Sequence, residues 1–420
     1  MHDLNEAFPY KICINLDRRP ERWKEMSSKF ERFNIRDVRR FSAVDGHNAS
    51  LPDGWSDSPG AYGCLRSHLE IVQQARKLGW PSVLIFEDDA AFDPQIPQNF
   101  RTYFSQVPAD WDMLHFGAHH MATPLDVAPN VVKITSANST FAYALKHTVF
   151  DSFIELNSRA LKAVDLNNRD LQSKHACYSF TPHLAWVEDV TSDVQVRRKY
   201  HWYLKESLVL YGSGMDRILK ETCVIIAYQN RERSEDIFQN LQFLIRFYDE
   251  YLRGVEVVVV EQGDEPTLDA LPCEHLFLAH DGPLNSAHCF NAGMAQTNHR
   301  FLIFSESDIF VEEWDIRGNL RICEKFDCAS GFSRSVNLTP AATELLRTSK
   351  PMLLTPWFDA GDYSQSEKQN VYEKFSVFNR ASIEAAGGWN ENISTLSMTT
   401  RRELRVFSSP NDALRMAASP

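Results

Sequence analysis

The sequence predicts an α/β protein with two domains, and three observations lead to this prediction. The chain has 420 residues, more than one hydrophobic core usually holds. Short apolar runs alternate with amphipathic stretches of helical spacing, as in sheets with crossover helices. One plan also occurs twice: the runs SVLIFEDDA (82–90) and RFLIFSESDIF (300–310) both read as strands that end on acidic residues. This repetition favours two similar domains.

The first domain is predicted from its strands and one helix. YKICINL (10–16) reads as the first strand. After a turn-like segment at 57–63, apolar residues at helical spacing predict a helix over 64–78, which leads into the strand 82–86. Further strands are expected at 112–117 and 141–146.

A glycine-serine-glycine break at Gly212–Gly214 marks the expected domain boundary, which gives domains of residues 1–213 and 214–420. Beyond this break the pattern restarts. Strands are expected at 223–228, 255–262 and 300–304, and helices at 234–251 and 287–295.

Composition and charge limit the classes of function. With 43% hydrophobic and 24% charged residues, the chain reads as a globular protein. The net charge of −12 argues against a general nucleic-acid binder, because phosphate backbones are held mainly by Lys and Arg. The start of the chain does not read as a signal peptide, and no segment approaches the roughly 20 uninterrupted apolar residues of a membrane span. We therefore expect a cytoplasmic protein.

The 8 cysteines are scattered, without CxxC pairs or a tight Cys/His cluster in the sequence. This spacing favours reduced thiols in the core over a disulfide framework or a zinc site. The histidines of HFGAHH, His115, His119 and His120, could supply a metal ligand or contacts to an acceptor. A solvated loop is the preferred interpretation of this segment.

The acidic residues at the strand ends are the main candidates for chemistry. Glu87, Asp88 and Asp89 follow directly after one apolar run, and Glu306 and Asp308 follow the other. Open α/β sheets bind ligands at the carboxyl ends of their strands, and adjacent carboxylates repel one another unless a cation holds them. Carboxylate oxygens suit Mg²⁺ or Mn²⁺. A solvated acidic turn is the alternative for either cluster.

Several ordered motifs give the first half a resemblance to glycosyltransferase family 25, which contains lipooligosaccharide and collagen galactosyltransferases. These motifs, spread over roughly residues 8–200, are INLDRRPERW (14–23), FSAVDG (41–46), GAYGCLRSHLEI (60–71), LIFEDDA (84–90) and TPHLAWVEDVTSDV (181–194). The resemblance implies an enzyme with a GT-A (Rossmann-like) fold that moves a sugar from a nucleotide-sugar donor, usually with inversion. Galactose and a UDP-sugar are the favoured donor chemistry.

The resemblance also implies roles for individual residues of the first half. Glu87 and Asp89 are the expected ligands of Mn²⁺ or Mg²⁺. Asp165 is the first candidate for the catalytic base, ahead of Asp170 and Asp193, although each could instead be a helix cap. The expected donor contacts are Asn15, Arg18, Arg19, Arg22, Asp45, Gly46, Ser67, His68 and Asp88. An exposed basic helix start and an Asp-Gly turn remain alternatives for the arginines and for Asp45–Gly46.

The second half resembles the donor-binding part of the β-1,4-galactosyltransferases and related family 2 enzymes. The matching segments are VIIAYQNRERSEDIFQNL (224–241), PLNSAHCFNAGM (283–294), FSESDIF (304–310) and AAGGWNEN (385–392). This similarity implies a second GT-A domain in tandem, with Glu306 and Asp308 as its metal pair. The donor contacts that it implies are Tyr228, Arg231, Asn285, Asn291 and Gly293.

The second half also departs from that pattern. ISTLSMTTRREL (393–404) replaces the expected Trp-Gly-x-x-Glu-Asp element, and no histidine follows His299. Gln229 and Ser286 stand where arginines are usual. A divergent active domain and a degenerate one kept for packing, oligomerisation or acceptor binding both remain open.

Three functions are compatible with these patterns. The preferred one is an inverting, metal-dependent glycosyltransferase that extends a lipopolysaccharide or another surface glycan, with one or both domains active. The alternatives are a metal-dependent hydrolase of nucleotide sugars and an inactive glycan-binding scaffold. A lipid-linked acceptor would bring the protein to the inner membrane face, where QVRRKYHWYLK (195–205) could contact anionic lipid. The oligomeric state is not predicted.

Overall fold

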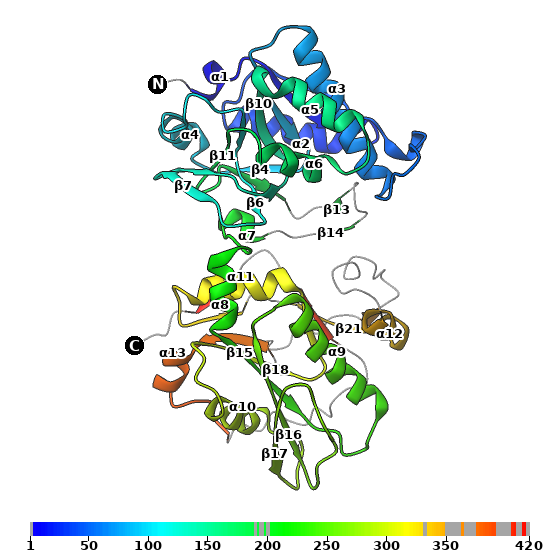
Figure 1. Ribbon diagram of the computed structural model, residues 1–420, viewed down its shortest axis with the longest axis vertical. Coiled ribbons are helices and arrows are strands. Elements are labelled where there is room, and N and C mark those ends of the chain that lie inside the picture. Colours follow the sequence, from blue (N-terminus) through cyan, green and yellow to red (C-terminus); the bar gives the residue numbers. More distant parts are fainter. Residues whose placement is uncertain are drawn as a thin grey trace. The chain divides into compact units, whose positions relative to one another are not determined.

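The computed structural model divides the chain into two compact units, Met1–Gly212 and Ser213–Pro420 (Figure 1). Both units are α/β. Among the described residues, no helix is both long and apolar enough to cross a membrane. The structure describes residues 3–188, 191–192, 197–198, 202–330, 334–348, 363–364, 375–391, 405–408 and 414–416.

The first unit is built on an eight-stranded sheet of order β2-β1-β3-β10-β5-β11-β8-β7. β1 lies parallel to both β2 and β3, whereas β10 is antiparallel to β3 and to β5. The carboxyl ends of β1, β2 and β3 therefore meet at one edge. The strands are β1 (Lys11–Asn15), β2 (Val38–Ser42), β3 (Ser82–Glu87), β5 (Met113–His115), β7 (Leu125–Ala128), β8 (Val131–Lys133), β10 (Ala142–Lys146) and β11 (Cys177–Phe180).

Helices of the first unit pack against this sheet, and α3 and α5 lie side by side (Figure 1). Apolar residues of α3, among them Leu65 and Val72, share one buried core with Val83 and Ile85 of β3. The helices are α1 (Leu4–Ala7), α2 (Pro20–Arg32), α3 (Pro59–Lys77), α4 (Ile96–Phe104), α5 (Phe150–Ser158), α6 (Val164–Gln172) and α7 (Trp202–Lys205). Three short pairs complete the unit: β4 (Ala90–Phe92) with β12 (Ala185–Val187), β6 (His119–His120) with β9 (Ala137–Asn138), and β13 (Thr191–Ser192) with β14 (Arg197–Arg198).

The second unit repeats a parallel core. Its main sheet has the order β17-β16-β15-β18-β23-β20-β25, in which β17, β16, β15 and β18 are parallel and β23 is antiparallel to β18. These strands are β15 (Thr222–Tyr228), β16 (Glu256–Gly263), β17 (Glu274–Ala279), β18 (Phe301–Glu306), β20 (Cys328–Ser330), β23 (Phe375–Asn379) and β25 (Leu414–Met416).

A smaller sheet of order β19-β24-β21-β22 accompanies the main sheet of the second unit. Its strands are β19 (Ile309–Val311), β21 (Arg334–Leu338), β22 (Tyr363–Ser364) and β24 (Arg405–Ser408). The helices are α8 (Ser213–Lys220), α9 (Glu235–Tyr251), α10 (Ser286–Ala295), α11 (Glu313–Cys323), α12 (Pro340–Thr348) and α13 (Arg380–Ala385).

The structure confirms the strands expected from apolar runs, which correspond to β1, β3, β5, β10, β15, β16 and β18. It also confirms α9 and α10. The helix expected over 64–78 begins earlier, at Pro59, because the Ser58 hydroxyl accepts a hydrogen bond from the Ala61 N–H and proline is favoured in the first turn. β17 was missed, although its sequence includes the apolar run 276–279.

Candidate active site

A cleft opens at the carboxyl ends of β1 and β3 in the first unit. It holds about 630 Å³ of empty space, its open mouth included. Loops that follow β1, β2 and β3 and one side of α3 form its walls, as expected for the ligand edge of an open α/β sheet. Its lining includes ten of the predicted residues: Asn15, Arg18, Arg22, Asp45, Gly46, Ser67, His68, Glu87, Asp88 and Asp89.

Asp88 is held inward by residues from β1 and α2. Its Oδ2 accepts a hydrogen bond of 2.6 Å from Asn15 Nδ2, and its Oδ1 lies 3.1 Å from Arg22 Nη1. Burial raises the pKa of Asp88 above its ordinary value, although these two partners oppose the rise. Arg40 of β2 completes the arrangement by donating to Asn15 Oδ1 at 2.8 Å. Asp88 therefore lines the cleft.

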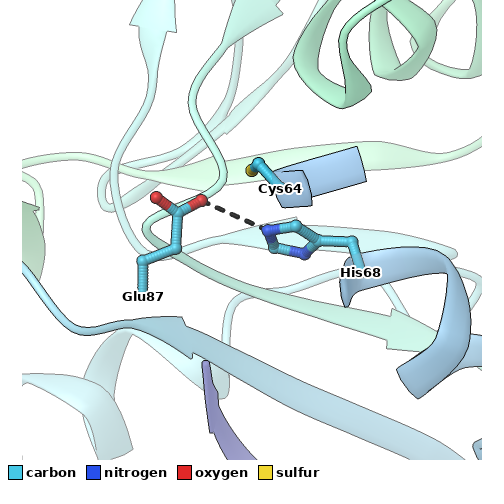
Figure 2. Close-up of side chains that lie close together, drawn as sticks. All are labelled: Cys64, His68 and Glu87. Carbon is cyan, nitrogen blue, oxygen red and sulfur yellow. Dashed lines mark hydrogen bonds and ion pairs between the residues drawn. The ribbon is translucent and has the colours of Figure 1, made fainter. Parts of the chain in front are cut away.

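The carboxylate of Glu87 contacts a residue of α3 and a residue of the segment before β10. Its Oε1 accepts a hydrogen bond from Thr140 at 2.5 Å and lies 3.3 Å from His68 Nε2 (Figure 2). The other ring nitrogen of His68 lies 3.0 Å from the Tyr143 hydroxyl. Burial tends to raise the pKa of Glu87, but the contacts with His68 and Thr140 outweigh it and hold this pKa below its ordinary value. Glu87 is therefore ionised at neutral pH.

Asp89 differs from its two neighbours. Its Oδ1 is buried and has no hydrogen-bond partner among the described residues. Burial first, and then the charges of Glu87 and Asp88, raise the pKa of Asp89 to about 8. A buried carboxylate oxygen without a partner beside two further carboxylates fits a divalent cation, which would supply the missing contact and the positive charge. The residues present therefore fit the predicted Mn²⁺ or Mg²⁺.

The loop after β2 packs directly on α3. Asp45 caps the short 3-10 helix Gly46–Asn48 and accepts a hydrogen bond from Arg18 Nε at 2.9 Å, which holds the pKa of Asp45 below its ordinary value. A Cβ on Gly46 would lie 1.7 Å from the Pro59 carbonyl oxygen, so only glycine fits there. Ser67 is fully buried and accepts from the Val44 N–H at 2.9 Å. Ser67 thus fixes the wall of the cleft.

Three predicted residues of the first unit, Arg19, Asp165 and Asp170, lie outside the lining of the cleft, and a fourth, Asp193, is not described. Arg19 occupies the N-cap position of α2 and pairs with Glu21, outside the lining of the cleft. Asp165 lies in the first turn of α6, where burial raises its pKa, and its charge acts on Cys64 together with that of Glu87. Asp170 pairs with Lys162 at 3.3 Å on the surface. Asp193 lies outside the described residues.

The acid pair of the second unit is buried. Glu306 ends β18 and accepts a hydrogen bond of 2.9 Å from the Ser286 hydroxyl, and Asp308 is 1% exposed. Tyr228 is fully buried, and burial raises its pKa to about 12. Arg231 lies at the surface, where it donates to the His280 carbonyl at 2.8 Å and pairs with Asp264. Glu306 and Ser286 therefore lie in contact, whereas Tyr228 is not accessible to a ligand.

The remaining three predicted donor contacts have structural partners. Asn285 caps α10 by accepting from the His288 N–H. Asn291 exchanges two hydrogen bonds of 2.8 Å with the backbone of Trp389. A Cβ on Gly293 would lie 2.4 Å from Ile225 Cγ2, so this glycine allows α10 to pack closely on β15.

Sequence reasoning missed Thr140 and Tyr143, because they approach the cleft from β10 and its preceding segment, more than 50 residues after Glu87 in the chain.

The solvated-loop interpretation of HFGAHH is wrong for two of its histidines. His115 and His120 are 1% and 3% exposed, and burial lowers the pKa of each to about 3. The cysteines are free, and five of the eight are buried, which confirms core thiols.

Comparison with known proteins extends this description. The family model described as "Glycosyltransferase family 25 (LPS biosynthesis protein)" matches residues 8–166. A "Glycosyltransferase 25 family member" of Drosophila pseudoobscura pseudoobscura is 34% identical over 126 residues, which cover 25% of this chain and 20% of the relative. The human "Inactive glycosyltransferase 25 family member 3" is 29% identical over 164 residues, which cover 33% of this chain and 27% of the relative. The chain thus spans about a fifth of the length of the insect relatives that it matches.

Among solved structures, the mannosyltransferase PcManGT from Pyrobaculum calidifontis, in complex with GDP-Man and Mn²⁺, is 13% identical. The match covers 41% of this chain and 48% of the mannosyltransferase chain, with a TM-score of 0.25. A TM-score of this size does not establish a common fold. The candidate cleft lies wholly within residues 8–166, the region that matches glycosyltransferase family 25.

Proposed function

We propose that the first unit is a metal-dependent glycosyltransferase, which moves a sugar from a nucleotide-diphosphate donor to a hydroxyl group of a glycan acceptor. The observation that carries this proposal is the buried, unpartnered Oδ1 of Asp89, which lies in the same cleft as Glu87 and two arginines. Carboxylates for a cation and guanidinium groups for phosphate are the chemistry that a diphosphate leaving group requires.

Asp89 and the outer oxygen of Glu87 are the groups that would hold Mn²⁺ or Mg²⁺ in this cleft. When bound, the cation would neutralise charge on the diphosphate. Arg18 and Arg22 line the cleft near Asp45 and Asp88, where they can exchange part of their carboxylate contacts for phosphate oxygens. The loop that contains Gly46 would lie along the nucleotide.

The acceptor hydroxyl needs a base, and we assign this role to Asp165. Burial raises the pKa of this carboxyl, which makes it a stronger base, and its charge acts on the cleft residue Cys64. Asp170, paired with Lys162 on the surface, is the weaker candidate. From the family resemblance we also propose inversion at the anomeric carbon. The same resemblance favours galactose as the sugar and UDP as the nucleotide.

The acceptor is proposed to be a lipopolysaccharide or another surface glycan, in keeping with the printed description of the matching family. A lipid-linked acceptor would require contact with the cytoplasmic membrane face. The basic segment 195–205 that we propose for this contact lies largely outside the described residues. Unchanged binding to anionic vesicles after Arg197, Arg198 and Lys199 are replaced by glutamine would count against it.

The second unit is proposed as a degenerate GT-A domain. The burial of Glu306, Asp308 and Tyr228 favours the degenerate alternative, in which this unit no longer binds a donor. An inactive first unit is also an alternative, because some relatives carry "inactive" in their printed names.

Calorimetric titration of UDP-sugars and GDP-sugars with Mn²⁺ tests the proposal on the wild type, Asp89→Asn and Asp308→Asn. We expect one site that is lost with Asp89→Asn and kept with Asp308→Asn. A second site lost with Asp308→Asn would show a donor-binding second unit. No binding of any nucleotide sugar would overturn the transferase proposal in favour of a scaffold. A hydrolase would be favoured if the protein released the sugar to water at a rate that acceptors do not increase.

A further inference from the structure

We propose that the second unit binds a zinc ion through Cys223, Glu256 and His299, at the edge of its sheet opposite the acidic residues. The sulfur, carboxylate and imidazole donor atoms of these three residues all lie within 4.8 Å of one another. Nothing in the sequence spacing indicates this cluster, because the three residues are separated by 33 and 43 positions.

The parallel sheet brings the three residues together. Cys223 is the second residue of β15, and Glu256, the first residue of β16, lies directly opposite it in the strand register. His299 lies two residues before β18, the other neighbour of β15. Three adjacent parallel strands therefore each contribute one donor group at their amino ends, and a rigid sheet fixes the positions of two of them.

A second set of contacts orients the histidine. His299 Nδ1 lies 2.6 Å from the Thr297 hydroxyl, which leaves Nε2 directed to Glu256 Oε2 at 3.9 Å. Metal-binding histidines usually donate their other N–H to such an oxygen. The Thr297 side chain also acts on Cys223, where it opposes the rise in the pKa of the thiol and so favours the thiolate. Arg380 holds the loop in place by donating to the carbonyl groups of Thr297 and His299 at 2.7 Å.

The donor set suits zinc better than magnesium or manganese. Thiolate and imidazole ligands select borderline cations, and the combination of one thiolate, one carboxylate and one neutral imidazole balances the charge of Zn²⁺. Tetrahedral zinc needs donor atoms about 3.5 Å apart, so the observed spacing requires only a small inward movement of the side chains. Three protein ligands leave a fourth position for water.

Access and proton balance are compatible with binding. The side chains of Glu256 and His299 are 41% and 23% exposed, whereas Cys223 is fully buried and forms the floor of the site. Burial raises the pKa of Cys223 to about 12. Zinc therefore has to displace the thiol proton, which passes to solvent, and affinity should rise with pH.

The site is independent of the proposed donor-binding function. His299 and Glu306 are separated by the length of β18, about 20 Å at the rise of an extended strand. The proposed donor-binding cleft lies in the first unit, so loss of zinc can leave sugar transfer intact, and the two proposals can fail separately.

Titration of the metal-free full-length protein with Co²⁺ tests this inference, because Co²⁺ bound to thiolate gives an intense near-ultraviolet charge-transfer band. We expect one equivalent of Co²⁺ to produce the band and one equivalent of Zn²⁺ to remove it. Cys223→Ser should abolish the band, and Glu256→Gln and His299→Gln should weaken binding. Thr297→Val should weaken binding by about 10- to 100-fold, as for other partners of metal-bound histidine.

Matched controls address folding and the first unit. Cys289→Ser removes another buried thiol of the second unit, and Asp89→Asn removes the proposed ligand in the cleft. Both should keep the charge-transfer band, and circular dichroism should show that each variant is folded. The inference is overturned if wild type gives no thiolate band, or if the band survives in folded Cys223→Ser. Because Glu256→Gln and His299→Gln alter partly exposed groups, unchanged Co²⁺ affinity in both would overturn it as well.

Discussion

The carboxylate of Glu87, at the end of β3, lies 3.3 Å from Nε2 of His68, a fully buried residue of α3. This pair joins the sheet to the helix that forms one wall of the cleft. It also helps to keep Glu87 charged, because the contacts with His68 and Thr140 together outweigh the effect of burial on the pKa of Glu87.

Replacement of this histidine should therefore change the pH dependence of the site. In His68→Gln we expect the pKa of Glu87 to rise, because the variant loses the contact with the imidazole that opposes the effect of burial. The acid limb of the pH profile for Mn²⁺-dependent donor binding should therefore move to higher pH. Calorimetric titrations between pH 4 and 7 measure it. Arg66→Gln, on the exposed side of α3, is the control. An unmoved limb in His68→Gln would contradict this prediction.

Cation binding should depend on the ionisation of Asp89. Because its pKa is raised to about 8, this carboxyl is largely protonated at neutral pH and must lose its proton when Mn²⁺ binds. The apparent affinity should rise by about tenfold per pH unit below pH 8 and level off above it. Titrations in buffers of different ionisation enthalpy should show release of about one proton at pH 7. Proton-free binding at that pH would exclude Asp89 as the ligand.

The same carboxyl should affect stability in the metal-free protein. A carboxyl whose folded-state pKa is raised contributes stability that is complete below its unfolded pKa of 3.8 and is lost as the pH rises through about 8. Asp89→Asn cannot ionise, so its Tm should exceed that of wild type at pH 8.5 and approach it at pH 5. Differential scanning calorimetry measures this difference. Equal Tm values at both pH values would contradict the raised pKa.

Gly46 should not tolerate a side chain. The added Cβ of Gly46→Ala would meet the Pro59 carbonyl at 1.7 Å and force the loop away from α3. We expect a loss of about 1–3 kcal/mol in the free energy of unfolding, together with weaker donor binding. Denaturant unfolding and titration measure the two effects. Gly263→Ala is the control, because its Cβ would meet nothing closer than 3.5 Å.

Asn291 is expected to act in packing. Asn291→Ala removes both hydrogen bonds to the Trp389 backbone, which should lower the free energy of unfolding by about 1–3 kcal/mol. Donor affinity of the folded protein should stay unchanged. Gln296→Ala, an exposed change at the end of the same helix, controls for local effects. A lower donor affinity without loss of stability would instead support a donor contact at Asn291.

The sequence predicted the cleft well where neighbouring parallel strands decide the geometry. Asn15 and Asp88 follow two apolar runs, and the carboxyl ends of parallel strands meet at one edge. It could not predict Thr140 and Tyr143, because an apolar run such as FAYALK indicates a strand but not its neighbour. Motif similarity also gave no sign that Tyr228, the last residue of β15, is fully buried.

The position of β11 in the sheet has a consequence for truncated forms of the protein. The match to family 25 ends at residue 166, but β11, Cys177–Phe180, pairs with both β5 and β8. A fragment cut at 166 would leave β5 with a bare edge, and unpaired edges of apolar strands template aggregation. A soluble fragment must therefore extend at least through Phe180, so the boundary of sequence similarity is not the boundary of the folding unit.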